Sequence, residues 1–198
     1  MREQKGTSNT GPNRQRHDDG KKARSIIRDI RRASFHDHDM IVYPDLPSFR
    51  KIYSECTKQA LDSNEIVVLA TTYDSIDKVV KSLSQSGISV ASETRAGNLT
   101  ILDSIRLYQI DVQGAFKFIK SLLVRSNRDN KSGIFNISDL GSFFLAERLS
   151  TLVDYEQSIP KKMDIPFKGF CTYHKDDFAS LSKEQQEMIL SAHNQVMK

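Results

Sequence analysis

The sequence predicts an α/β domain in which a mainly parallel β-sheet is flanked by helices. From residue 36 onward, segments with strand-like periodicity alternate with segments of helical periodicity. The run EIVVLAT, Glu65–Thr71, is apolar through its centre, as expected for a strand buried on both faces of a sheet. Alternation of this kind normally makes each helix a crossover between parallel strands, which gives layers of helices around the sheet.

A basic segment precedes this domain. Residues 1–33 hold ten lysines and arginines against four acids, so the chain's net charge of +4 comes from this segment and the remainder is acidic. Residues 1–22 contain too few apolar side chains to offset the entropy of ordering, and we expect them to be disordered. In RSIIRDIRR, three isoleucines share one helical face, so this stretch either docks on a partner or frays. The chain therefore divides into a basic, mostly disordered tail, 1–33, and one domain, 34–198.

The first half of the domain contains two strands and two helices. The first strand has Met40–Tyr43 as its buried part, and a helix follows near Pro47 with Phe49, Ile52, Tyr53, Cys56 and Ala60 along one face. Glu65–Thr71 is the second strand. The second helix is expected to start at Asp74, as its N-cap, and to stop at Gly87.

The second half continues the alternation. We expect strands at 88–93, 99–108, 133–138 and 167–173. A helix begins after Asp111 and ends in the polar loop RSNRDNKSG, and another runs from Ser182 to the end of the chain. Between them, Ser138 or Asp139 caps the longest helix, which is expected to reach about Ile159.

Composition excludes several classes of protein. Two cysteines are too few for a disulfide scaffold or a thiolate zinc cluster, and both are expected to be reduced thiols of a cytoplasmic protein. No apolar run approaches the roughly 20 residues of a membrane span, and the N-terminus lacks the apolar centre of a secretory signal. We therefore expect no contact with a membrane.

Nucleotide hydrolysis requires a phosphate-binding loop between a buried strand and the next helix. The junction after EIVVLAT is Thr72-Tyr73-Asp74, which has no glycine and no lysine and places an acid where the phosphate would lie. The only Gly-x-x-x-x-Gly spacing, Gly6 to Gly11, continues into Pro12 instead of lysine. The motif evidence therefore argues against a classical ATPase.

The stretch HDHDMIVYPD, residues 36–45, raises a metal hypothesis. On a strand, His36 and His38 point to one face, but no third ligand stands at a diagnostic spacing, and His174 and His193 cannot be placed from sequence. We favour the simpler interpretation that these polar residues mark the exposed start of a strand. Ideal strand geometry also places His38 and Tyr43 on opposite faces.

Two later segments carry polar groups among apolar ones. Glu156 occupies a hydrophobic position in the stripe of Leu145, Leu149, Leu152 and Ile159, with Tyr155 beside it. Such a carboxylate is either paired in a binding pocket or reaches water from a frayed helix end, and both interpretations stay open. On the last strand, Cys171 and Tyr173 share one face, and we favour a buried structural thiol over a nucleophile.

Taken in order, these residues resemble the MEDS family, the methanogen/methylotroph DcmR sensory domain. The resemblance covers about residues 36–198 and rests on His38-x-x-x-x-Tyr43, the EIVVLAT strand without a phosphate loop, Asp154-Tyr155-Glu156, Phe170-Cys171-Thr172-Tyr173 and a late His193. It implies a three-layer RecA-like domain, related to KaiC-type ATPases but lacking their phosphate loop. It also implies sensing of small molecules in signal transduction or transcription control.

We therefore expect a non-enzymatic sensory domain that needs no cofactor and no metal. An unknown small molecule is expected to bind near the carboxyl ends of the parallel strands, and a signalling protein or a second copy of the chain reads the result. Alternatives are a nucleic-acid-associated regulator acting through residues 1–33, a degenerate RecA-like nucleotide-binding protein, or a degenerate enzyme using Glu156. The candidate ligand-binding residues are His38, Tyr43, Thr72, Tyr73, Asp74, Tyr155, Glu156, Cys171, Tyr173 and His193.

Overall fold

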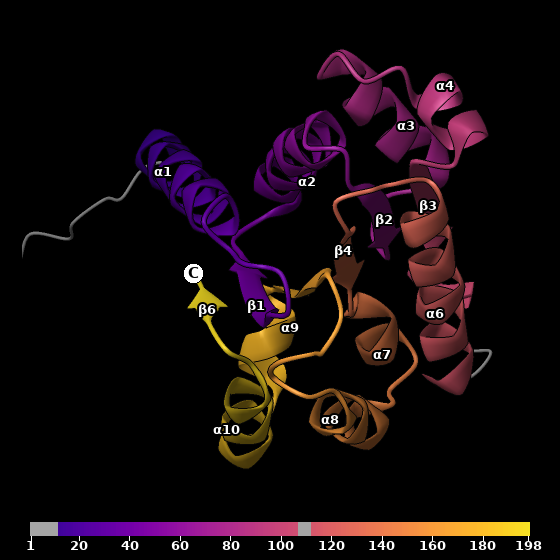
Figure 1. Cartoon of the computed structure of the whole chain (residues 1–198). Helices are drawn as coiled ribbons and strands as arrows, with labels where there is room; N and C mark the ends of the chain where they lie inside the picture. Colours follow the sequence, from indigo (N-terminus) through magenta and orange to yellow (C-terminus); the bar gives the residue numbers. More distant parts are fainter. Residues whose placement is uncertain (1–11, 107–111) are drawn as a thin grey trace, which may run out of the picture.

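A six-stranded parallel sheet organises the protein, shown in Figure 1 as a computed structural model that describes residues 12–106 and 112–198. The strand order is β3-β2-β4-β5-β1-β6, and every neighbouring pair is parallel. The strands are β1 (His38–Tyr43), β2 (Ile66–Thr71), β3 (Leu99–Asp103), β4 (Ile134–Asp139), β5 (Phe167–His174) and β6 (Val196–Met197). The predicted α/β class is thus confirmed.

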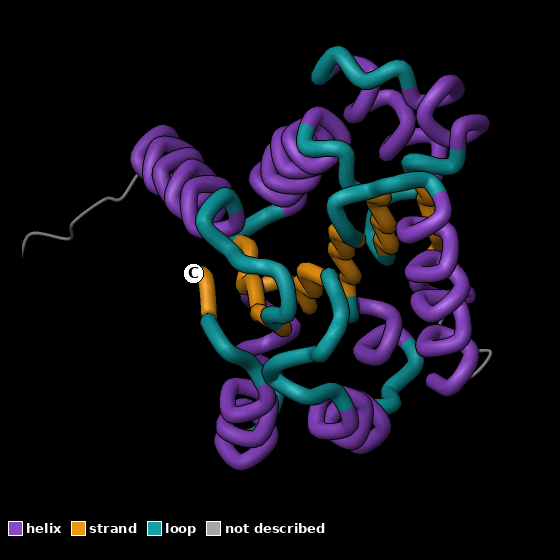
Figure 2. The backbone as a smooth tube through the Cα atoms, in the orientation of Figure 1, coloured by secondary structure: helices purple, strands orange, loops and turns teal. Residues whose placement is uncertain are grey.

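Helices cover both faces of the sheet, which gives three layers (Figures 1 and 2). On one face lie α1 (Pro12–Ile30), α2 (Leu46–Asp62), α3 (Ile76–Gln85) and α4 (Val90–Ala96). On the other lie α6 (Val112–Arg128), α7 (Gly141–Leu145), α8 (Leu149–Ser158), α9 (Lys175–Ser180) and α10 (Lys183–Ala192). No helix in residues 12–106 or 112–198 combines the length and the hydropathy that a membrane crossing requires.

The face of the sheet toward α1 and α2 carries the larger apolar core. Tyr43 belongs to this core and stacks on Phe49 of α2 with a ring separation of 4.2 Å. His38 points to the opposite face, toward α8 and α10, so the predicted division of these two side chains is confirmed. The sheet therefore separates His38 from Tyr43, although both belong to β1.

Helix α1 packs against α2 through its apolar stripe. Ile26, Ile27 and Ile30 are almost completely buried in the core, and the guanidinium of Arg31 donates to Gln59 of α2 at 2.9 Å. The amphipathic segment that we expected to dock on a partner or to fray thus docks on its own domain. Residues 1–11 of the predicted disordered tail lie outside the described residues.

The strongest local patterns of the sequence are found in the structure. Helix α2 starts where Pro47 predicts, with the Asp45 carboxylate accepting from the backbone of Ser48 at 2.7 Å, and its predicted apolar face is buried. All residues of β2 are buried, as its continuous apolar run predicts. The strand predicted for 99–108 is β3, but it ends at Asp103 and residues 104–106 are helical; Tyr108 lies outside the described residues.

Three predicted elements are wrong. Residues 88–93 are not a strand: α4 starts at Val90 and ends at Ala96, followed by Gly97, whose φ of 69° is favourable for glycine. The single long helix to Ile159 is divided into α7 and α8 at Glu147, which has a φ of 54°. The last helix ends at Ala192 instead of the chain end, because the chain turns back to add β6 beside β1.

Asp74 does not cap the second helix. Ser75 is the N-cap residue of α3, whereas the Asp74 carboxylate accepts two hydrogen bonds from Arg50 of α2, at 2.9 and 2.8 Å. The pair links α2 to the loop after β2. A guanidinium offers a bidentate, charge-assisted contact that a single backbone N–H cannot match, which explains why the carboxylate faces Arg50.

Candidate functional site

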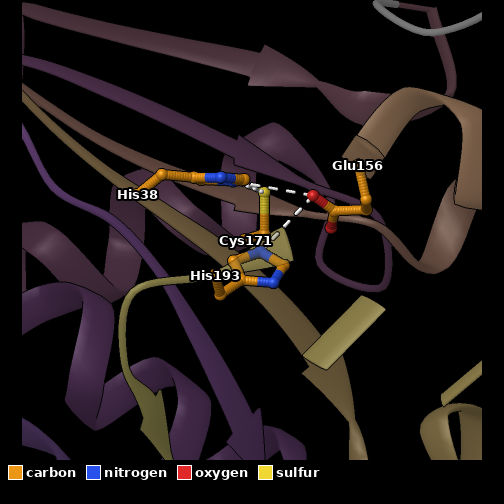
Figure 3. A group of neighbouring side chains, drawn as sticks. All are labelled: His38, Glu156, Cys171 and His193. Atoms are coloured by element: carbon orange, nitrogen blue, oxygen red, sulfur yellow. Dashed lines mark hydrogen bonds and ion pairs between the residues drawn. The ribbon is translucent and has the colours of Figure 1, made fainter. Parts of the chain in front are cut away.

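Four buried side chains from four different elements meet on the face of the sheet toward α8 and α10 (Figure 3). His38 begins β1, and Cys171 lies on β5, the neighbouring strand. Glu156 belongs to α8, and His193 follows the last residue of α10. One nitrogen, oxygen or sulfur atom of each residue lies within 4.8 Å of those of the other three. We refer to these four residues as the buried cluster.

The contacts within the buried cluster converge on one carboxylate oxygen. Oε2 of Glu156 lies 3.5 Å from Nε2 of His38 and 3.4 Å from Nε2 of His193 (Figure 3). Nε2 of His38 also lies 3.2 Å from the sulfur of Cys171. All four side chains have at most 4% of their surface exposed, so water does not screen their interaction.

Two further contacts hold the cluster in place. The hydroxyl of Tyr173 donates to Oε1 of Glu156, which leaves Oε2 to face the two histidines. Nδ1 of His193 lies 2.7 Å from the carbonyl oxygen of Ile189, one turn earlier in the chain. A carbonyl only accepts, so Nδ1 carries a proton and donates it there. In the neutral ring, Nε2 is then a lone-pair acceptor directed at the carboxylate.

The shared environment moves the pKa values in opposite directions. Burial favours the neutral acid, but the nearby His193 and His38 rings and the Tyr173 hydroxyl lower the pKa of Glu156 overall. Burial lowers the pKa of His193, yet Glu156 outweighs it and raises that pKa. Burial and then His193 lower the pKa of His38 to about 4. Burial and the Glu156 charge raise the pKa of the Cys171 thiol well above its ordinary value.

A cavity of about 340 Å³ adjoins the buried cluster, on the same face of the sheet. Its roof is formed by α6 and the 160–165 segment, and Tyr155 and Ile159 close one side. Most lining side chains are apolar. The polar ones are His38, Asn136 and Ser138 on the strands of the floor and the exposed Lys120, Lys162 and Asp164 around the roof. The floor crosses the sheet through Leu102, Val68, Asn136, Ser138, Gly169, Cys171 and His38.

A glycine in the centre of the floor makes room for the ring of Phe167. Gly169 of β5 lies between Asn136 of β4 and His38 of β1 in the register of the sheet. A Cβ added at Gly169 would lie 2.5 Å from the ring of Phe167, which occupies the space above the strand. Asn136 of the apolar strand GIFNIS was the sequence signal for this floor that our prediction missed.

The structure divides the predicted site residues into two groups. His38, Tyr155, Glu156, Cys171, Tyr173 and His193 lie in or beside the buried cluster and the cavity. The other four, Tyr43, Thr72, Tyr73 and Asp74, lie elsewhere: Tyr43 on the opposite face, and the rest at the carboxyl ends of the strands. The cavity thus lies over the face of the sheet and not at the edge where we expected the ligand.

The residues at the carboxyl ends already bind one another. The hydroxyl of Thr72 donates to the carbonyl of Asp139 at 3.0 Å, and Tyr73 donates to Asp177 at 2.6 Å. The backbone of Thr72 donates to the Asp139 carboxylate at 3.1 Å. Acidic side chains thus lie at this edge of the sheet, and Asp45 caps α2 directly after β1. Because these carboxylates occupy the positions that an anion would take, the strand ends are unfavourable for binding a phosphate.

Two local hypotheses from the sequence are decided by these contacts. The pairing of His36 with His38 is wrong: His36 is exposed, has a φ of 80°, and directs Nδ1 to the carbonyl of Met163 at 2.9 Å. β1 starts only at His38, so strand alternation does not apply to His36. The interpretation that we favoured, an exposed start of the strand, is also wrong, because Asp37, His38 and Asp39 are buried. Glu156 is fully buried, which excludes the frayed helix end and leaves the paired carboxylate.

Comparison with known protein families gives one match. The family model described as MEDS, the methanogen/methylotroph DcmR sensory domain, matches residues 37–194. The matched segment includes β1 to α10 and all four residues of the buried cluster. No curated protein matches the chain.

Proposed function

The chain belongs to the MEDS family of sensory domains, and from this premise we propose that it senses a small molecule bound in the cavity beneath α6. The observation that carries the proposal is the cavity itself. Its volume of about 340 Å³ is at the small end of the roughly 300–1,000 Å³ typical of ligand sites. An apolar lining over a partly polar floor suits a small, mostly apolar molecule with one hydrogen-bonding group.

We propose that the domain binds this molecule without transforming it. Glu156, the acid that a degenerate enzyme would use, is fully buried and is not among the side chains that line the cavity. His38 and Cys171 do line it, but burial lowers the pKa of the first and raises that of the second. Both side chains are therefore neutral hydrogen-bonding groups near pH 7 when they carry no other ligand.

The roof of the cavity suggests how binding is communicated. Phe118, Ile119 and Leu123 of α6 and Met163 of the 160–165 segment face the cavity. A ligand that packs against them stabilises one position of the roof relative to others, which shifts a pre-existing equilibrium. We propose that a signalling protein or a second copy of the chain recognises that position, in signal transduction or transcription control.

A cavity-filling substitution tests the proposal. Val68→Phe places a ring on the cavity floor, whereas Val124→Phe places the same ring on α6 at a site that is 72% exposed. Purified protein is denatured and released molecules are identified by mass spectrometry, and a panel of small neutral organic compounds is screened for a rise in melting temperature. We expect binding that Val68→Phe abolishes and Val124→Phe retains. No released molecule and no rise with any compound would refute small-molecule sensing.

Nucleic-acid binding through the basic segment is a second candidate, because α1 presents a charged face away from the core. Lys21, Lys22, Arg24 and Arg28 are exposed on the helix whose apolar face packs against α2, and Arg32 is exposed just after it. Charge reversal of Lys21 and Lys22 leaves that packing intact. We expect this charge reversal to weaken binding to duplex DNA and to reduce the dependence of that binding on salt concentration. Unchanged binding by the variant would show that α1 does not contact DNA.

A further inference from the structure

We propose that His38, Glu156, Cys171 and His193 together bind one Zn²⁺ ion. The proposal goes beyond the sensory function and does not depend on it, because it rests on the buried cluster alone. One sulfur, two imidazole nitrogens and one carboxylate oxygen form a ligand set that zinc accepts in proteins. This proposal departs from our sequence-based expectation of no metal.

The separations between the polar atoms match those of ligands around one ion. Zinc–ligand bonds of about 2.0–2.3 Å in a tetrahedron place neighbouring ligand atoms roughly 3.3–3.7 Å apart. Nε2 of His38 lies 3.2 Å from the Cys171 sulfur and 3.5 Å from Oε2 of Glu156. Nε2 of His193 lies 3.4 Å from the same oxygen. All four ligand atoms are within 4.8 Å of one another, so a modest adjustment completes the tetrahedron.

The same atoms are poorly satisfied as a hydrogen-bonded network. Within the described parts of the chain, neither Oε2 of Glu156 nor Nε2 of His193 makes a hydrogen bond, although both are buried. Because His193 donates from Nδ1 to Ile189, its neutral ring directs a lone pair at the carboxylate. Without a metal ion, Glu156 favours a proton on this nitrogen, but the 3.4 Å separation exceeds the roughly 2.7–2.9 Å of a charge-assisted hydrogen bond. A cation between the two acceptors satisfies both.

The surroundings of the cluster resemble the outer shell of a metal site. Metal-bound histidines usually donate their other ring nitrogen to a carbonyl or carboxylate, as His193 does to Ile189. Ligating carboxylates usually accept a hydrogen bond on the free oxygen, as Glu156 does from Tyr173. The charges also balance, since a thiolate and a carboxylate neutralise a divalent ion. Binding releases the thiol proton of Cys171, and the proton that Glu156 favours on Nε2 of His193, to solvent.

His38 and Cys171 also line the cavity, which gives the ion a route to an otherwise buried position. The ligand groups come from β1, β5, α8 and the end of α10, so one ion would link four segments that are far apart in the sequence. Such a site stabilises the folded state, because the ligand set does not exist in the unfolded chain.

Cobalt substitution of the full chain tests the proposal. The protein is treated with a chelator, and Co²⁺ is titrated while the visible and near-ultraviolet spectrum is recorded. We expect one ion per chain, intense visible bands typical of tetrahedral Co²⁺, a thiolate-to-cobalt charge-transfer band, and displacement of all bands by Zn²⁺. Absence of Co²⁺ binding, or binding without the charge-transfer band, would overturn the proposal.

The two cysteines of the chain provide a matched control. Cys171→Ser should abolish the charge-transfer band, whereas Cys56→Ser, in the core on the opposite face, should retain it. Tyr173→Phe keeps all four ligands but removes the outer hydrogen bond, and should weaken Co²⁺ binding roughly 10–100-fold. Retention of the band in Cys171→Ser would refute the site. If that variant does not fold, X-ray absorption spectroscopy of the cobalt-loaded wild type tests the site instead. A cobalt coordination shell without sulfur would refute it.

Discussion

Replacing Ile26 with alanine tests whether α1 is part of the folded domain. The side chain is fully buried against the α2 layer, so the substitution removes three carbon atoms from the core. At about 0.8 kcal/mol for each buried methylene, the lost transfer free energy is about 2.4 kcal/mol, and the residual cavity adds to it. We expect the free energy of unfolding to fall by about 3 kcal/mol, which corresponds to a melting temperature roughly 6–12 °C lower.

Urea unfolding followed by circular dichroism measures this change, and a second isoleucine provides the control. Ile76 is on α3 and is 38% exposed, so Ile76→Ala should cost less than about 1 kcal/mol. Equal, small effects of the two substitutions would show that α1 does not contribute to the core and that the packing described above is wrong. A large effect of Ile26→Ala alone would establish that the domain begins well before residue 34.

Three other substitutions address buried polar groups. Burial raises the pKa of Asp139 to about 7 from its usual 3.8, so the folded protein keeps a proton that the unfolded chain releases above about pH 4. The stabilisation by this proton is complete at low pH and is lost as the pH rises through 7. Between pH 4 and 8, the unfolding free energy of the wild type should therefore fall by about 4 kcal/mol relative to that of Asp139→Asn. Parallel pH profiles of the two proteins would contradict this. Arg50→Met leaves the buried Asp74 carboxylate without two hydrogen bonds and should cost about 1–3 kcal/mol in urea unfolding, with a neutral result contradicting the pair. Tyr173→Phe removes the donor to Glu156 and should cost about 1–3 kcal/mol in chelator-treated protein, whereas unchanged stability would mean that this bond is replaceable.

The predictions that succeeded depend on neighbours in the chain. β2 was predictable because a strand buried on both faces shows a continuous apolar run. The start of α2 was predictable because Pro47 favours the first helical turn, where the structure adds Asp45 as the cap. In each case the side chains that define the element lie within a few residues of one another, so the sequence pattern does not depend on long-range packing.

The predictions that failed involve competition between local preference and packing. Glu147 has good helical propensity, yet it adopts a left-handed conformation that separates α7 from α8. Leu145 ends α7 largely exposed, while Leu152 of α8 is fully buried, so the single stripe inferred from the sequence does not exist. The end of α10 likewise depends on an available edge of β1, a feature that no local pattern contains.

The sequence by itself determined the class of the fold, most of its strands, and the identity of several chemically unusual residues. Glu156 interrupted an apolar stripe, and Cys171 and Tyr173 shared a strand face, because side-chain periodicity is a local property. Only the tertiary structure decided that these residues meet His38 and His193, which are 155 positions apart in the sequence. That encounter depends on β5 lying beside β1 and on α8 and α10 covering the same face, and strand order and helix docking are set by long-range packing.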